Sequence, residues 1–217
     1  MMDELTLVQR IVVWMLPVIF AITGHEVAHG WMAKQYGDKT AEQQGRLSLN
    51  PLKHIDPLGT IIIPGLLLIT FTGFIFGWAK PVPVDARNFK NPKKAMMIVA
   101  LAGPLANLAM AIGWALLARV GTILDFEFVS MPLIYSGVAG ITINLVLALI
   151  NLLPIPPLDG SRILTGLLPN YWAWRYNQLE RYGFIILIVL LATNALSYIL
   201  AYPMFYAQQL FFSLAGM

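Results

Sequence analysis

Residues 7–31 have the sequence LVQRIVVWMLPVIFAITGHEVAHGW, an apolar run long enough to cross a bilayer as one helix. Its second half contains His25, Glu26 and His29, three ionisable side chains within five residues. At membrane depth even one carboxylate costs at least ~2.5 kcal/mol, so this cluster requires compensation. Residues four apart share a helix face, so the two imidazoles can bind one metal ion, and Glu26 can take a proton from water at that ion. The alternative is a polar cluster at the interface without metal.

The rest of the chain is apolar in the same way. Of 217 residues, 58% are hydrophobic and 12% are charged, about half the charged fraction of a soluble domain. Lipid must therefore cover much of the surface. Further apolar runs lie at residues 58–78, 95–120, 132–153 and 182–202, with a shorter apolar tail to residue 217. We expect a single all-α membrane domain over residues 1–217.

The charge distribution predicts the topology. All Lys and Arg residues except Arg10 and Arg119 fall in three regions, 34–53, 80–94 and 162–181. Cytoplasmic loops collect Lys and Arg, so we expect these regions on the cytoplasmic side. The run 58–78 has basic loops at both ends and is expected to be re-entrant, which leaves about four spans. Basic residues spread over short loops form no basic face for nucleic acid.

A catalytic zinc usually has three protein ligands, and the chain has no cysteine to serve as one. Glu42 and His54 lie in polar loops and are expected to be solvated or, for His54, to support the site indirectly. Asp159 is the better candidate, because it ends the stretch NLLPIPPLDG at residues 151–160. The prolines break the helix, and broken helices at membrane depth line protein cavities. By itself Asp159 could also be a capping residue at a helix end.

The stretch GWAKPVPV at residues 77–84 predicts a short strand. Prolines 81 and 83 remove the N–H donors from one side, as in an edge strand. Val82 and Val84 keep theirs on the other side, where an unwound substrate could add as a neighbouring strand. The alternative is a rigid proline loop that links two membrane segments.

Three motifs together resemble the site-2 protease family of intramembrane zinc metalloproteases, in its compact bacterial branch. They are HEVAH at 25–29, AGPLAN at 102–107 and NLLPIPPLDG at 151–160, and their order fits over residues 7–180. The resemblance implies one zinc per chain, with His25, His29 and Asp159 as ligands and Glu26 as general base. It also implies that Asn151 holds the substrate carbonyl or oxyanion.

The same resemblance places Asn107 beside the active site, in contact with substrate. From the sequence alone Asn107 would instead be a residue of helix packing near Gly103, because small residues let membrane helices approach closely.

The resemblance further implies that the protein cleaves transmembrane segments of other proteins in a bacterial cell membrane, toward the cytoplasmic side. Many members of the family carry a PDZ or CBS domain, whereas no polar stretch here is long enough for one. We expect a membrane partner to take over any regulation. Three other functions remain open: a metal transporter, a protease of the prenyl-protein-processing type and an inactive scaffold that binds membrane proteins.

Overall fold

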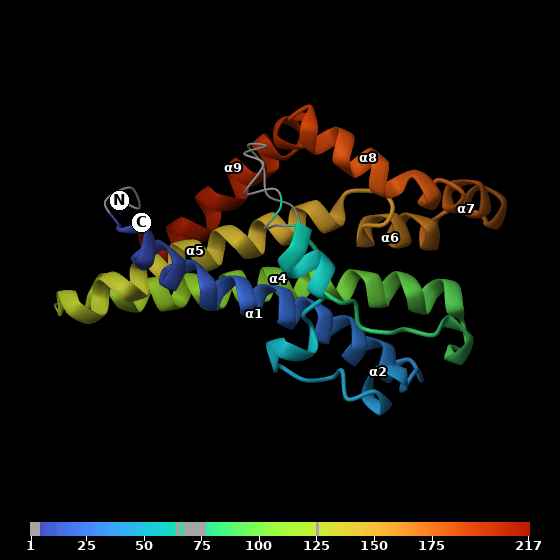
Figure 1. Cartoon of the computed structure of the whole chain (residues 1–217), viewed down its shortest axis with the longest axis horizontal. Coiled ribbons are helices and arrows are strands. Elements are labelled where there is room, and N and C mark those ends of the chain that lie inside the picture. The colour runs from blue at the N-terminus through green and yellow to red at the C-terminus, as the bar shows by residue number, and fades with distance from the viewer. Residues whose placement is uncertain (1–4, 64–65, 67–76, 125) are drawn as a thin grey trace.

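The computed structural model describes residues 5–63, 66, 77–124 and 126–217, and these residues form helices and loops without a strand. Three long helices make the centre of the bundle: α1 (Leu7–Gln35), α4 (Pro92–Ile123) and α5 (Glu127–Leu152). Each is long and apolar enough to cross a membrane. They pack against one another along much of their length (Figure 1). The predicted all-helical membrane class is therefore confirmed.

The ends of these helices follow from local sequence. Thr6 caps α1 through a reciprocal capping box with Gln9, which satisfies two backbone donors at the helix start. Asn91 caps α4, whose first residue Pro92 has no N–H to leave unpaired. The last turn of α5 is followed by the proline-rich loop that starts after Leu153.

Small residues let α4 and α5 approach closely. A Cβ on Gly140 would lie 2.2 Å from the Trp114 ring, and one on Gly137 would lie 2.5 Å from the Ala118 Cβ. Membrane helices associate through such contacts because lipid supplies no hydrophobic drive between them. The buried core here combines residues of α4, α5 and α9, namely Ala111, Ala115, Ala118, Ile141, Leu145, Phe211 and Ala215.

The C-terminal part differs from the expected span at residues 182–202. Helix α8 (Glu180–Ala192) and helix α9 (Ala195–Ala215) meet at a bend of 78°. The break falls at Asn194, whose φ of 57° is left-handed, a conformation that asparagine tolerates. Helix α9 then packs against α4 and α5 instead of forming a short tail. The described chain thus has three candidate spans, or four if α8 and α9 together count as one.

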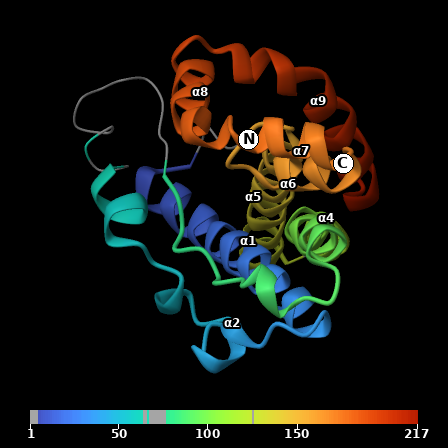
Figure 2. The same ribbon diagram turned by 90° about the vertical axis from the view of Figure 1, so that its right-hand side faces the viewer.

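Short elements gather at the bundle end opposite the two termini (Figure 1). They are α2 (Thr40–Gln43), α6 (Asp159–Leu167) and α7 (Asn170–Asn177), with the 3-10 turn η4 (Ala86–Asn88). The 3-10 turn η2 (Pro51–Lys53) and the π-helical turn η3 (Pro57–Ile62) lie nearer the middle of the bundle (Figure 1). Figure 2, seen from that end, shows α6 and α7 beside α4 and α2 below α1.

The predicted short strand at residues 77–84 is wrong. The segment is extended but has no ladder partner among the described residues. Its prolines supply no N–H, and the N–H groups of Lys80 and Val82 are used by His54 and Glu26 instead of a strand. The predicted re-entrant run at 58–78 falls largely outside the described residues.

Candidate metal centre

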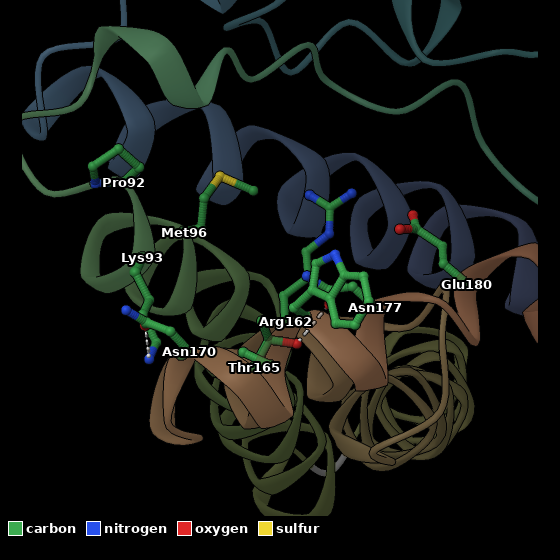
Figure 3. A pocket seen from close by; sticks show the side chains of 11 residues that line it. Pro92, Lys93, Met96, Arg162, Thr165, Asn170, Asn177 and Glu180 are labelled. Atoms are coloured by element: carbon green, nitrogen blue, oxygen red, sulfur yellow. Dashed lines mark hydrogen bonds between the residues drawn. The ribbon is translucent and has the colours of Figure 1, made fainter.

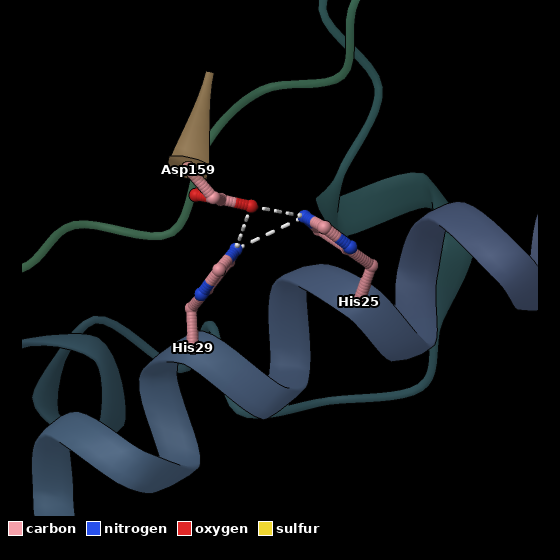
Figure 4. A group of neighbouring side chains, drawn as sticks. All are labelled: His25, His29 and Asp159. Carbon is pink, nitrogen blue, oxygen red and sulfur yellow. Dashed lines mark hydrogen bonds and ion pairs between the residues drawn. The ribbon is translucent and has the colours of Figure 1, made fainter. Parts of the chain in front are cut away.

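Three side chains from distant parts of the chain converge inside the bundle. His25 and His29 lie one turn apart on α1, and Asp159 is the first residue of α6 (Figure 4). The Asp159 Oδ2 lies 3.1 Å from His25 Nε2 and 3.3 Å from His29 Nε2. The two Nε2 atoms are 3.0 Å apart. One ligand atom from each side chain thus points to a common place.

Hydrogen bonds on the far side of each imidazole determine its tautomer. His25 Nδ1 lies 2.6 Å from Asn107 Oδ1, and His29 Nδ1 lies 2.7 Å from the Val99 carbonyl. Asn107 directs its oxygen at His25 because its Nδ2 donates to the carbonyl of Ala21 and to Asn144 Oδ1. Both partners of the imidazoles are acceptors, so each Nδ1 carries the hydrogen. In a neutral imidazole the Nε2 then has a free lone pair.

This arrangement fits a bound cation. Two imidazole lone pairs and one carboxylate oxygen meet with no donor between them, and Asp159 Oδ2 is buried without a hydrogen-bond donor. The distances of Asp159 Oδ2 from both histidines nevertheless fall within ion-pair range. Three acceptors at such distances repel one another unless a positive ion lies among them. Two histidines and one carboxylate are a donor set that catalytic zinc uses.

Helix α4 supplies the wall behind the histidines. Val99, Gly103 and Asn107 follow at intervals of four residues and so lie on one face of the helix. A Cβ on Gly103 would come within 2.5 Å of His29 Nε2 and 2.6 Å of His25 Cε1. Only glycine leaves both rings room at this position.

Glu26 is held by the segment that follows residue 76. Its Oε2 accepts a hydrogen bond of 2.8 Å from the N–H of Val82. Arg46, a buried residue, donates through Nη2 to the carbonyl oxygens of Lys80 and Pro81 at 2.8 and 3.3 Å. The N–H of Lys80 donates to the carbonyl of His54. The backbone around Val82 is therefore held from two sides.

Asp38, which is fully buried just after α1, ties down the next part of the same segment. Its carboxylate accepts hydrogen bonds from the backbone N–H of Asp85, from Asn88 Nδ2 and from Thr40. Burial by itself would raise the pKa of Asp38, but these hydrogen bonds outweigh it and lower the pKa below its usual value. Asp38 thus stays ionised and keeps the loop attached to the end of α1.

The other predicted site residues lie in different surroundings. Asn151, half-buried in the last turn of α5, donates through Nδ2 to the carbonyl of Leu147. Val84 packs beside the buried cluster of Ala33, Phe89, Ala95 and Val99. Glu42 is exposed and pairs with Lys34 at 2.6 Å.

Two further predicted residues are more enclosed than expected. His54 is buried and bonds through Nε2 to the Ser48 carbonyl, outside the group of converging ligands. Asn107 is fully buried, and its amide is engaged by protein groups on both sides. This arrangement supports a role for Asn107 in orienting the His25 ring. It gives no support to contact between Asn107 and substrate.

Sequence reasoning did not find Asn144, Asp38, Arg46 or the carbonyl of Val99. A signal existed for Asn144, because an asparagine inside an apolar helix requires a polar partner and Asn107 is another such residue in the central helices. Asp38 and Arg46 lie in a loop where charged residues are ordinary. Backbone carbonyls leave no trace in a sequence.

Comparisons with known proteins identify the family of the chain. The model of peptidase family M50 matches residues 123–193, which include Asn151 and Asp159. YwhC of Bacillus subtilis is 44% identical over 201 residues, 87% of this chain and 84% of the relative. Rip2 of Mycolicibacterium smegmatis is 34% identical over 174 residues, 80% of this chain and 64% of the relative.

A third relative, MJ0611 of Methanocaldococcus jannaschii, is 30% identical over 165 residues, 75% of this chain and 72% of the relative. All three relatives have names that assign them provisionally to the zinc metalloproteases. No solved structure matches the chain. From the family model, the relatives and the apolar helices together, we conclude that the chain belongs to peptidase family M50, the site-2 proteases, and is an integral membrane zinc metalloprotease.

Proposed function

We propose that this protein hydrolyses peptide bonds in or near transmembrane segments of other membrane proteins, with Glu26 as general base. The observation that carries the proposal is the convergence of His25, His29 and Asp159. Glu26 follows His25 directly in α1, a helix apolar enough to span the membrane. The three side chains are proposed to hold one zinc ion. When bound, zinc lowers the pKa of water to about 7 and polarises a carbonyl.

The residues of the chain divide the remaining work. Glu26 accepts a proton from the attacking water and later gives it to the leaving amine. Asn107 and the Val99 carbonyl keep both Nδ1 hydrogens in place, so that the Nε2 lone pairs face the metal position. Asn151 is proposed to donate from its amide to the oxyanion of the tetrahedral intermediate. For this it must exchange its present bond to Leu147 for one to substrate.

Val82 is proposed to receive the substrate backbone. An unwound substrate presents free carbonyl groups, and the N–H of Val82 lies directly at the general base. That N–H is now bound to Glu26, so a substrate carbonyl that pairs with Val82 takes the donor away from the carboxylate. Val84 offers a second donor two residues on. Pairing here would place the extended substrate along the metal position.

The orientation in the membrane is proposed from charge. The three basic regions lie toward the same end of the bundle, to which the C-terminal half of α1 also leads (Figure 1). By the positive-inside rule this end faces the cytoplasm, here of a bacterial cell, and the catalytic centre lies nearer that side. Regulation is proposed to come from a separate membrane partner.

The test is a comparison of membrane proteomes from cells with wild-type protein and with the Glu26→Gln variant. Glutamine preserves size but cannot take a proton, so uncleaved membrane segments should accumulate in the variant while its zinc content stays near one per chain. Glu42→Gln is the matched control, since Glu42 is exposed and pairs with Lys34 at the surface. Retention of most of the cleavage by Glu26→Gln would remove Glu26 from the mechanism. Zinc passage across vesicles by both forms, without cleavage, would instead indicate a transporter.

A further inference from the structure

A cavity of about 520 Å³ opens among the first turn of α4, helices α6 and α7 and the start of α8 (Figure 3). The side chains that bear on its chemistry are Lys93, Arg162, Thr165, Asn170, Trp174 and Asn177. None of them belongs to the converging ligands of the metal centre. The cavity therefore needs an explanation of its own.

The charges in the cavity favour an anion. Lys93 donates through Nζ to the Leu168 carbonyl and to Asn170 Oδ1, which holds its ammonium group at the cavity wall. Arg162 is exposed and makes no hydrogen bond or ion pair within the described part of the chain. Glu180 is the one acid among the lining residues, so the lining carries two cations and one anion. Arginine can bind phosphate with two parallel hydrogen bonds, so the Arg162 guanidinium, in a lining of net positive charge, is suited to phosphate.

The position of the cavity points to a lipid as the source of that phosphate. Helix α7, which forms one wall, exposes Tyr171, Trp172 and Trp174 by 58 to 60% each. Exposed tryptophan and tyrosine collect at the level of the lipid headgroups. Helix α8 then begins the next apolar stretch. The cavity thus lies where the bundle passes from apolar surface to polar loops.

We propose that this cavity binds the phosphate head of an anionic phospholipid. Lys93 and Arg162 contact the phosphate oxygens, the side-chain amide nitrogens of Asn170 and Asn177 offer further donors, and Trp174 covers the glycerol part. Basic pockets between helices on the cytoplasmic side are a recurrent form of lipid headgroup site. Arg162 lies one turn after Asp159 on α6, so a bound headgroup also braces the helix that carries Asp159.

The test is native mass spectrometry of the full chain in detergent micelles doped with phosphatidylglycerol or phosphatidylcholine. Wild-type protein should retain phosphatidylglycerol in preference. Arg162→Gln and Lys93→Gln should each weaken this retention about fivefold, and the double variant should weaken it more than either single variant. Glu180→Gln should strengthen it, because it removes the repelling charge. Lys39→Gln loses the same charge at an exposed position outside the cavity and should leave retention unchanged.

Two results would overturn the proposal. One is equal retention of both lipids by wild-type protein, or retention of phosphatidylglycerol that the double variant leaves unchanged. The other is binding of soluble glycerol phosphate as tight as that of the lipid, which would make the cavity a site for a free phosphate compound. Neither readout depends on proteolysis, so the proposal stands or falls independently of the proposed function.

Discussion

At the scale of single residues, the metal centre is a place where acceptor atoms converge and no hydrogen-bond donor lies among them. The Nδ1 hydrogens of His25 and His29 are committed to Asn107 and to the Val99 carbonyl, which leaves acceptors only at the meeting point with Asp159. Groups that hydrogen-bond a metal-binding side chain commonly change metal affinity by about 10- to 100-fold. Two substitutions separate direct ligands from the groups that orient them.

Asp159→Ala should weaken zinc binding more than about 100-fold. The substitution removes a direct ligand, and loss of a ligand should cost more than the roughly 10- to 100-fold that loss of an orienting group costs. The measurement is a competition titration of the purified protein with a zinc chelator. Glu127→Ala, at an exposed acid in the first turn of α5, is the control and should bind zinc as wild type does. Unchanged zinc affinity in Asp159→Ala would show that Asp159 is not a ligand, and His54 would be tested next.

Asn107→Ala should lower zinc affinity by about 10- to 100-fold, since it frees the His25 ring and removes the donor that bonds the Ala21 carbonyl and the Asn144 Oδ1. At saturating zinc its KM for substrate should stay near the wild-type value. A raised KM with unchanged zinc affinity would be the opposite result and would mean that Asn107 contacts substrate.

At the scale of elements, the segment at residues 77–85 is a loop held by hydrogen bonds to other loops and not the short strand that its sequence predicts. Arg46 and the carbonyl of His54 hold its first part, and Asp38 holds its end. The N–H of Val82 is thereby presented to Glu26 by contacts with the loops around the end of α1. A local preference for extended backbone was readable from the prolines, whereas the partner of each N–H was not.

Val82→Pro should reduce cleavage about tenfold or more relative to Val82→Ala, because only proline removes the N–H that bonds the Glu26 carboxylate, and such charged hydrogen bonds contribute about 1.5–3 kcal/mol. Both variants lose the isopropyl group, and because proline also fixes φ, the two are compared only where folding is unchanged. The measurement is the cleavage rate at matched zinc content and matched thermal stability. Equal rates in the two variants would mean that this N–H serves neither Glu26 nor substrate.

At the scale of the whole molecule, the basic loops lie toward one end of the bundle and the termini toward the other (Figure 1). A helix bundle can place its loops this way in either orientation, so sidedness depends on the charges and not on the packing. Because the chain has no cysteine, single cysteines report on each end without interference.

A cysteine in place of Arg87 should resist an impermeant thiol reagent added outside intact cells and react after the membrane is opened. Arg87 is exposed, and its pairing with Asp85 is a surface contact that contributes little to stability. A cysteine in place of Glu127, between α4 and α5 at the other end, should react from outside and serves as the internal control. Labelling of the Arg87 position from outside would overturn the proposed orientation.

By itself the sequence determined the helical membrane class, because length and apolarity of a run are local properties that a bilayer tests directly. It also determined that His25, Glu26 and His29 share a helical neighbourhood, since their spacing matches one turn. Only the tertiary structure decided which histidine atoms lie near Asp159 and that Gly103 leaves room for both imidazole rings. It also decided that α9 packs against α4 and α5 after the break at Asn194. These contacts join residues far apart in the chain, and close packing between helices, not any local preference, selects them.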